Sequence, residues 1–359
     1  MKRTGACAVV LGALALLAGA AGPALAQEST QELPLGGLSI ARTPDATLSI
    51  DSADIVINPD SVVAKYRITN TGVAPASVTL GFTIPELDYS DPDVSYAIPA
   101  SDPMNFVGLA TKIAGKPGGF AFAQSAVLDG KDISATLRQY KLAMVPVGTF
   151  QNQVAALPPE QRAKLEQTGA IAEVGNDAQG NPLYFPKWTV RTAGSKRFVF
   201  PPAQPVDIEI RYRTSVGMSL DTPLRLPLRN ERGLAPQVQF RRVEYCIDDA
   251  FYPGLDKIAA LPGPVPAVAP GASGAPLAPT PQEANTNRLR ERRMIFALKH
   301  LVALGPVKDF RLVVDKGRPD RVVSFCLENL KRISPTAFEM RAVDYTPTRD
   351  LKVLTIGKN

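Results

Sequence analysis

Apolar and polar residues alternate along much of this 359-residue chain. In residues 61–70, SVVAKYRITN, every second residue from Val62 to Ile68 is apolar, and residues 77–85 and 206–214 repeat the pattern. Such alternation is typical of antiparallel strands with one packed face and one solvated face. The same period returns near the C-terminus, at 308–315, 337–343 and 351–356. The sequence therefore predicts a mainly β fold of antiparallel, sandwich-like sheets.

Two segments break this pattern with helix signals. Residues 158–169 begin with two prolines, which a first helical turn tolerates, and end with a glycine. Residues 132–144 begin with the candidate N-caps Asp132 and Ser134. We therefore expect three parts after residue 26, an N-terminal β-sandwich region, a short helical insertion or connector, and a C-terminal β-sandwich region, at 27–130, 131–180 and 181–359.

The N-terminus has the pattern of a secretory signal peptide. Lys2 and Arg3 precede an apolar run that ends in Ala24-Leu25-Ala26. No later stretch approaches the roughly 20 apolar residues of a membrane-spanning helix. We expect cleavage after Ala26, which would give a periplasmic or secreted protein without a transmembrane segment.

The expected compartment favours one interpretation of the cysteines. Cys7 would leave with the signal peptide, and Cys246 and Cys326 would remain. An even pair in an oxidising compartment is most simply a disulfide. A cysteine nucleophile or a zinc site is the alternative, but each needs partners that one histidine, His300, hardly supplies.

A Pro-rich stretch separates the two cysteines. Residues 261–287 are rich in proline and small residues and have almost no charged or aromatic side chains. Such a segment buries too little apolar surface to offset the entropy lost on ordering. It is expected to be a disordered loop, with a Pro-rich partner-binding motif as the alternative.

Two acidic loops are the candidate ligand or metal sites. Calcium takes six to eight oxygen ligands, and loops of this kind can supply them. Neither loop has the regular spacing of an EF-hand, and Asp also favours turns for backbone reasons. Paired carboxylates could instead serve a glycoside hydrolase, if they faced each other across a cleft. The first loop offers Asp88, Asp91 and Asp93, and the second offers Glu244, Asp248 and Asp249.

Tyr184 and Trp188 are the candidate aromatic contacts. An exposed platform of such rings could stack on sugars or hold a peptide. Large aromatic side chains dominate burial in β-sandwiches, so a place in the core is the competing interpretation.

The charge is mildly positive after signal removal. Loss of Lys2 and Arg3 leaves 40 − 2 = 38 basic residues against 34 acidic residues, a net charge of +4. This excess is a weak hint of contact with a polyanion or the envelope, and an ordinary soluble surface is the favoured explanation. The densest run, RLRERRM at 288–294, could be a basic patch, and Glu291 dilutes it.

Several short motifs resemble one family of exported bacterial proteins, the domain of unknown function 4424. In the first half these are GGLSI at 36–40, YRITNT at 66–71, FTIPE at 82–86 and NFVG at 105–108. In the second half they are FVFPP at 198–202, YRTSVG at 212–217, EYCIDD at 244–249 and FRLVVDKGRPDRVVSFC at 310–326.

The resemblance implies a periplasmic, β-rich protein whose paired cysteines match Cys246 and Cys326. It supplies no catalytic residue. HLVALGP at 300–306 departs from the family pattern, because a tryptophan is expected before this Gly-Pro.

Walker, dinucleotide and nucleophile-elbow motifs are missing from the sequence, and His300 lies among apolar neighbours. We therefore expect a non-catalytic envelope protein that binds a protein partner or a surface polymer, with no cofactor and no nucleic acid. The alternatives are a carboxylate-based hydrolase of envelope sugars and a calcium-stabilised adhesion or scaffold module.

Overall fold

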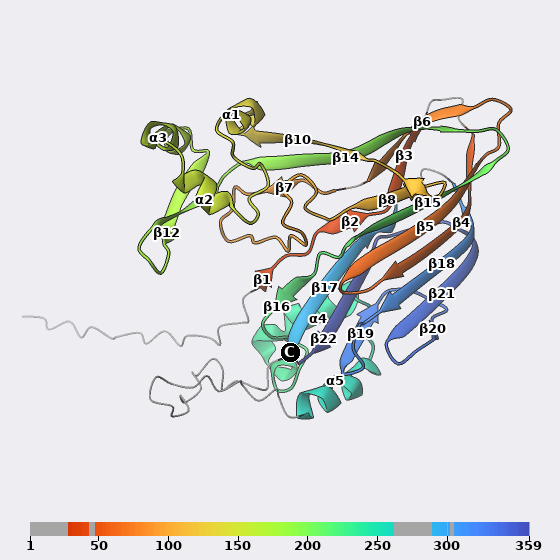
Figure 1. The fold of residues 1–359 in the computed structure, drawn as a ribbon. Helices are drawn as coiled ribbons and strands as arrows, with labels where there is room; N and C mark the ends of the chain where they lie inside the picture. The colour runs from red at the N-terminus through yellow and green to blue at the C-terminus, as the bar shows by residue number, and fades with distance from the viewer. Residues whose placement is uncertain are drawn as a thin grey trace, which may run out of the picture.

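The computed structural model describes residues 28–42, 47–82, 84–261, 289–299, 301 and 305–358. The expected signal peptide, His300 and all of the Pro-rich loop except Leu261 lie outside these residues. Strands account for 45% of the structure and helices for 17%, which confirms the predicted mainly β fold. Figure 1 shows packed sheets, with helices at two ends of the molecule.

The largest sheet has eight strands in the order β20-β21-β18-β4-β5-β15-β8-β9. Neighbouring strands are antiparallel except β4 and β18, which are parallel, with Ile55 opposite Leu312. Strands from both predicted β regions therefore share one sheet, and the boundaries at 130 and 180 stay predictions. The strands are β4 (Leu48–Ile57), β5 (Ser61–Asn70), β8 (Ala110–Ile113), β9 (Lys116–Pro117), β15 (Pro205–Arg213), β18 (Val307–Asp315), β20 (Lys331–Arg332) and β21 (Ala337–Tyr345).

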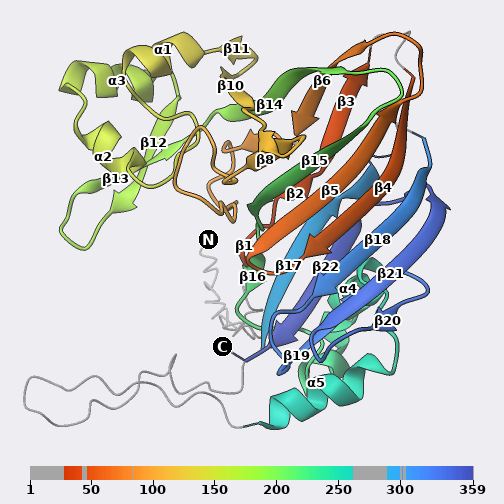
Figure 2. The same cartoon turned by 45° about the vertical axis from the view of Figure 1, so that its right-hand side comes forward.

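A six-stranded sheet packs behind it, in the order β1-β16-β17-β22-β19 with β2 paired to β17 (Figure 2). Its strands are β1 (Glu28–Thr30), β2 (Pro34–Gly36), β16 (Gly217–Ser219), β17 (Arg290–Ala297), β19 (Arg321–Phe325) and β22 (Leu351–Gly357).

A second six-stranded sheet has the order β11-β10-β14-β6-β3, with β7 paired to β14. It contains β3 (Leu38–Arg42), β6 (Ala76–Phe82), β7 (Leu87–Asp88), β10 (Ala121–Leu128), β11 (Lys131–Asp132) and β14 (Thr189–Phe200). A two-stranded sheet, β12 (Ile171–Asn176) and β13 (Pro182–Pro186), completes the β structure of the described residues.

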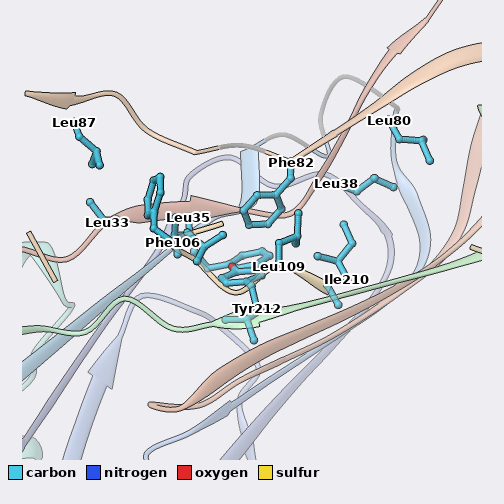
Figure 3. Packing of buried hydrophobic residues seen from close by; sticks show 14 of the residues in the cluster. Leu33, Leu35, Leu38, Leu80, Phe82, Leu87, Phe106, Leu109, Ile210 and Tyr212 are labelled. Carbon is cyan, nitrogen blue, oxygen red and sulfur yellow. The ribbon is translucent and has the colours of Figure 1, made fainter. Parts of the chain in front are cut away.

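The alternating residues place one face of these strands in a common core. In β5 the side chains from Val62 to Ile68 that share a face are buried, as the sequence pattern predicts. Figure 3 shows core side chains from β3, β6, β15 and the loops between the sheets pointing toward one another. The rings of Phe82 and Tyr212 meet edge to face with centroids 4.9 Å apart. The strands of all three large sheets therefore depend on one buried cluster.

Three helices, α1 (Ser134–Gln139), α2 (Phe150–Ala155) and α3 (Pro159–Gln167), lie within the segment expected to be helical. They project from the sheets together with β12 and β13 (Figure 1). None of the helices in the described part of the chain is long and apolar enough to cross a membrane.

Two further helices, α4 (Ala235–Glu244) and α5 (Phe251–Ala260), were not expected from the sequence. Pro253 and Gly254 obscure α5, although a proline in the first turn is compatible with a helix. Both helices lie under strands β17, β22 and β19 of the first six-stranded sheet (Figures 1 and 2). Leu255 and Ile258 of α5 pack with Leu354 and Ile356 of β22 in a second, smaller core.

Candidate functional site

A pocket of about 370 Å³ lies between α4 and the ends of β16 and β17, and we call it the α4 pocket. Pro223, Leu228, Pro236 and Phe240 supply its apolar lining. Glu291, Arg241, Asp221 and Thr222 are among its polar lining residues. A mainly apolar hollow with a few placed polar groups is the usual form of a ligand site.

Glu291 forms the floor of the α4 pocket and is fully buried. Its Oε1 accepts a hydrogen bond from the hydroxyl of Thr222 (2.8 Å), and its Oε2 accepts one from Nε of Arg241 (3.0 Å). Nη1 of Arg293 lies 3.5 Å from the same Oε2. Because a buried carboxylate is costly without partners, these contacts offset the cost of its burial and hold it in position.

Arg293 joins this floor to the neighbouring strands, with only 3% of its side chain exposed. It donates to Oγ of Ser219 in β16 (2.6 Å), and to Oε2 of Glu32 (3.1 Å) and the carbonyl of Thr30 (3.1 Å). Glu32 can lie this close to β16 only because residue 217 is a glycine, since an added Cβ there would stand 2.1 Å from Oε2 of Glu32. The charged floor is therefore part of the sheet's own packing.

Asp221 holds the loop that forms the side wall of the pocket. Its carboxylate accepts two hydrogen bonds from Arg225, of 2.7 and 2.5 Å. It also accepts the backbone N–H groups of Thr222 (2.9 Å) and Leu289 (3.3 Å). Donation of these hydrogen bonds to Asp221 raises the pKa of Arg225, so the guanidinium of Arg225 stays charged.

The opening of the pocket carries groups that the protein does not itself use. Phe240 is 55% exposed at the opening, and α4 has no buried residue at all. Across the described ranges, neither Nη atom of Arg241 nor the side-chain amide of Gln237 has a hydrogen-bond partner. The α4 pocket thus presents hydrogen-bond donors beside an aromatic ring, above a floor that is already satisfied.

The two cysteines that follow Ala26 in the sequence form a disulfide. It joins the residues just after α4 to the residue just after β19. The Cα atoms of Cys246 and Cys326 are 5.1 Å apart, and the bond closes a loop of 80 residues. Next to it, Oγ of Ser324 donates to the carbonyl of Tyr245 (2.8 Å). The bridge therefore ties α4 to the sheet whose strand β17 forms the pocket floor.

The second acidic loop does not bring its carboxylates together. Glu244 forms an ion pair with Lys352, and Asp249 pairs with Arg242 (3.1 Å) while remaining 90% exposed. Oδ1 of Asp248 accepts the backbone N–H of Phe251 (3.2 Å) at the start of α5. Each carboxylate has its own local partner.

The first acidic loop uses its carboxylates to shape turns. Oδ1 of Asp88 accepts the N–H of Ser90 (2.9 Å), and Oδ1 of Asp91 accepts the N–H of Asp93 (2.9 Å). This is the backbone reason for Asp in turns. Within the parts of the chain that the structure describes, no three or more His, Cys, Asp or Glu side chains gather as a metal ion would require.

Trp188 is fully buried, and its indole N–H donates to the carbonyl of Met144 (2.8 Å). It therefore packs in the core and offers no exposed ring. Tyr184 is also buried, but it lines a pocket of about 350 Å³ with Tyr89, Tyr96 and Phe150. The structure thus places Tyr184 beside the segment that contains the first acidic loop.

A larger pocket, of about 480 Å³, lies on the eight-stranded sheet. Charged side chains of neighbouring strands line it, and they pair with one another, as Arg67 does with Asp207 (2.9 Å). Exposed pairs of this kind are typical of a solvated face. We therefore place the candidate site at the smaller α4 pocket, where the charges are buried.

Sequence reasoning did not find the α4 pocket. The one signal was Glu291 inside the basic run at 288–294, because a lone acid among arginines suggests an internal partner. In β17 the run alternates, with Glu291 and Arg293 facing the pocket and Arg290 and Arg292 facing the other way. The rest of the site depends on a loop and a helix that the sequence pattern did not reveal.

The fold and this pocket define a mainly β protein of packed sheets with a ligand-sized hollow beneath a helix. The chain belongs to the family of the domain of unknown function DUF4424, whose model matches residues 26–354. Among curated proteins no relative matches the chain.

One similar solved structure comes from Legionella pneumophila and is described as a "putative nutrient binding protein". The match covers 92% of this chain and 72% of that chain, with a TM-score of 0.42 and 10% sequence identity.

Proposed function

We propose that this chain is an exported, non-catalytic envelope protein that binds a protein partner at the α4 pocket. The observation that carries the proposal is Phe240, a large apolar side chain that is 55% exposed at the opening of a pocket with a rigid, charged floor. The disulfide is compatible with a location outside the cytoplasm.

The surface around the opening favours a protein over a sugar polymer. Val243 on α4 is 67% exposed, and Leu226 and Leu220 on the adjoining loop are exposed as well. Grouped apolar side chains rimmed by charge mark protein interaction sites. A partner's apolar side chain would cover Phe240, and aromatic residues of this kind often dominate binding energy.

Arg241 and Gln237 would donate hydrogen bonds to the partner. Arg241 is held through its Nε by Glu291, so its two Nη groups are oriented before any partner arrives. Such donors suit a carbonyl or carboxylate oxygen of an extended segment, and Gln237 offers a further amide. Because the guanidinium of Arg241 is already held by Glu291, its engagement by a partner would cost little conformational entropy.

The proposal can be tested by selecting random peptides displayed on phage against the purified chain. We expect enriched peptides that bind the wild type and bind Phe240→Ala or Gln237→Ala much more weakly. Both residues lie at the surface of α4, so their replacement should leave stability within about 0.5 kcal/mol. Val199→Ala is the matched control, since Val199 is 54% exposed on β14. Peptides that bind all four proteins equally would remove the α4 pocket as the site.

A further inference from the structure

The pocket of about 350 Å³ that Tyr184 lines, here called the junction pocket, lies where the helical insertion meets the sheets. One side comes from the loop after β7, and the other comes from α2, β13 and the segment just before α2. Figures 1 and 2 show α2 and β13 at the end of the molecule away from α4. Among the described residues, the junction pocket and the α4 pocket share no lining residue, so the two are separate.

Aromatic rings lie on both sides of the junction pocket. Tyr89 and Tyr96 of the loop meet edge to face, with ring centroids 5.6 Å apart. The insertion supplies Phe150, Tyr184 and Phe185. Tyr96 and Phe185 keep part of their surface exposed, whereas the other three side chains are buried. Each side of the pocket therefore offers one partly exposed ring to a ligand.

Hydrogen bonds hold both sides of the pocket in place. The hydroxyl of Tyr96 accepts the backbone N–H of Asp88 (3.2 Å) and donates to the carbonyl of Asp88 (3.1 Å). In the insertion, the side-chain amide of Gln151 accepts the N–H of Tyr184 (3.0 Å) and donates to its carbonyl (2.6 Å). Because these groups are already positioned, a ligand would order few side chains on binding.

The lining of the junction pocket is uncharged across the residues that the structure describes. The nearby carboxylates of Asp88 and Asp91 accept backbone N–H groups of their own turns. A charged ligand would lose part of its hydration in the pocket without gaining an opposite charge in its lining. The lining therefore favours a neutral ligand.

The pocket also has hydrogen-bonding capacity that the protein leaves unused. The hydroxyl of Tyr89 is buried and has no hydrogen-bond partner among the described residues. Within the same part of the chain, Oγ of Ser95 and the second amide N–H of Gln151 are also without a partner. A purely apolar ligand would leave these groups unpaired, which costs free energy. The ligand should therefore carry polar groups as well as an apolar face.

We propose that the junction pocket binds a neutral sugar ring. The faces of a sugar ring carry C–H groups that pack against aromatic side chains, and its edge carries hydroxyls that both donate and accept hydrogen bonds. The sugar would lie between Tyr96 and Phe185, with hydroxyls toward Tyr89, Ser95 and Gln151. The volume of the pocket lies within the range of roughly 300–1,000 Å³ that is usual for ligand sites.

The first test is titration calorimetry of the full chain with three neutral disaccharides, maltose, cellobiose and chitobiose. We expect saturable heat with at least one of them, and Phe185→Ala should weaken that binding roughly tenfold or more. Phe198→Ala is the matched control, since Phe198 is also partly buried against the main core but lies on β14 outside the pocket.

Phe240→Ala should leave sugar binding unchanged, because Phe240 lines the α4 pocket. Absence of saturable binding with all three sugars, or equal binding by Phe185→Ala and Phe198→Ala, would overturn the proposal. Saturable binding of hexaproline in place of the sugars would also overturn it, since the junction pocket would then be a peptide site.

A second variant separates direct contact with the sugar from an effect on folding. Tyr89→Phe removes a hydroxyl that has no partner among the described residues, so without sugar it should melt at the temperature of the wild type or higher. Its gain in melting temperature on addition of the sugar should be smaller. Tyr212→Phe is the matched control, since the hydroxyl of Tyr212 is likewise buried and unpaired there, on β15. Equal gains in both variants would overturn the proposed arrangement of the sugar.

The sugar can be a free compound or a unit of an envelope polymer, and a further experiment separates these sources. Sedimentation with insoluble cell-wall sacculi reports on binding to the polymer. Binding to sacculi that Phe185→Ala loses and Phe198→Ala keeps would assign the pocket to a polymer unit. Disaccharide binding without binding to sacculi would assign it to a soluble sugar.

Discussion

Glu291 shows how a single buried charge can both hold a fold together and shape a site. It is fully buried on β17, and its two oxygens are shared among Thr222, Arg241 and Arg293. Removing one member of such a group leaves the others uncompensated in a poorly hydrated place. Its role in the pocket therefore cannot be separated from its role in stability.

We predict that Glu291→Ala lowers the free energy of unfolding by about 3–5 kcal/mol, because Arg293 would be left buried with fewer partners. Urea denaturation of the purified protein measures the change. Asp249→Ala is the control, because its ion pair is exposed and should contribute less than about 1 kcal/mol. A loss in Glu291→Ala as small as that of the control would contradict this view of the pocket floor.

Asp88 allows a prediction about pH. The backbone N–H and the hydroxyl of Ser90 hold the pKa of Asp88 below its usual range. A carboxyl with a lowered pKa in the folded state contributes stability above its unfolded pKa of about 4 and loses it as pH falls through the folded value. We expect the melting temperature of Asp88→Asn to fall less than that of the wild type on acidification below about pH 4.

Melting curves of both proteins from neutral to acidic pH would test this prediction. Asp93→Asn, in the same loop, shows whether loss of any carboxylate there has the same effect. An acid response of Asp88→Asn identical to that of the wild type would show that the turn formed by Asp88 does not contribute to acid sensitivity.

At the scale of elements, the strands were predictable and helix α4 was not. Residues 61–70 form β5 with the expected buried face, because a strand that packs on a core must alternate. Helix α4 has no fully buried side chain, although the partly buried Val238 packs against the second core, so its sequence lacks the wide apolar stripe of a core-facing helix. Its position also depends on the disulfide and on contacts from Arg241, which no local pattern encodes.

The acidic loops show a second limit of sequence reasoning. A run of Asp residues can serve as metal ligands or as turn caps, and the sequence is the same in both cases. For Asp91 the structure supplies the backbone N–H that its carboxylate accepts. Which interpretation applies depends on where the neighbouring carboxylates point, and that is a tertiary property.

The disulfide gives a prediction at the scale of elements. We expect Cys246→Ser combined with Cys326→Ser to lower the free energy of unfolding by about 4–5 kcal/mol, as the chain-entropy model gives for a loop of this length. Hydrogen exchange should show α4 and α5 losing protection before the strands of the main core, because the small core that they share depends on this tie. Unchanged protection of α4 and α5 would contradict a stabilising role for the bridge.

At the scale of the whole molecule, parallel pairing between β4 and β18 joins the two ends of the chain. Residues 309–314 lie in register with residues 52–57 in the middle of the eight-stranded sheet (Figure 2). One buried cluster runs from Leu33 to Val353. The alternating pattern predicted these strands, but it could not predict which distant strands would pair.

We therefore predict that a fragment ending at residue 260 leaves β4 unprotected, since one edge of β4 would lose its partner. Hydrogen exchange of the β4 amides in the fragment and in the full chain would measure this. Native-like protection of Ile55 and its neighbours in the fragment would show that the N-terminal part folds without β18.

The binding claim is tested most directly by photocrosslinking in the cell from a photoreactive residue at position 240 of the full chain. The control carries the same residue at position 199, which has the same exposure but lies on β14, at the end of the molecule away from α4 (Figures 1 and 2). We predict a discrete crosslinked protein from position 240 and none from position 199. The absence of any product at position 240, or an equal product at both positions, would contradict a protein-binding role for the α4 pocket.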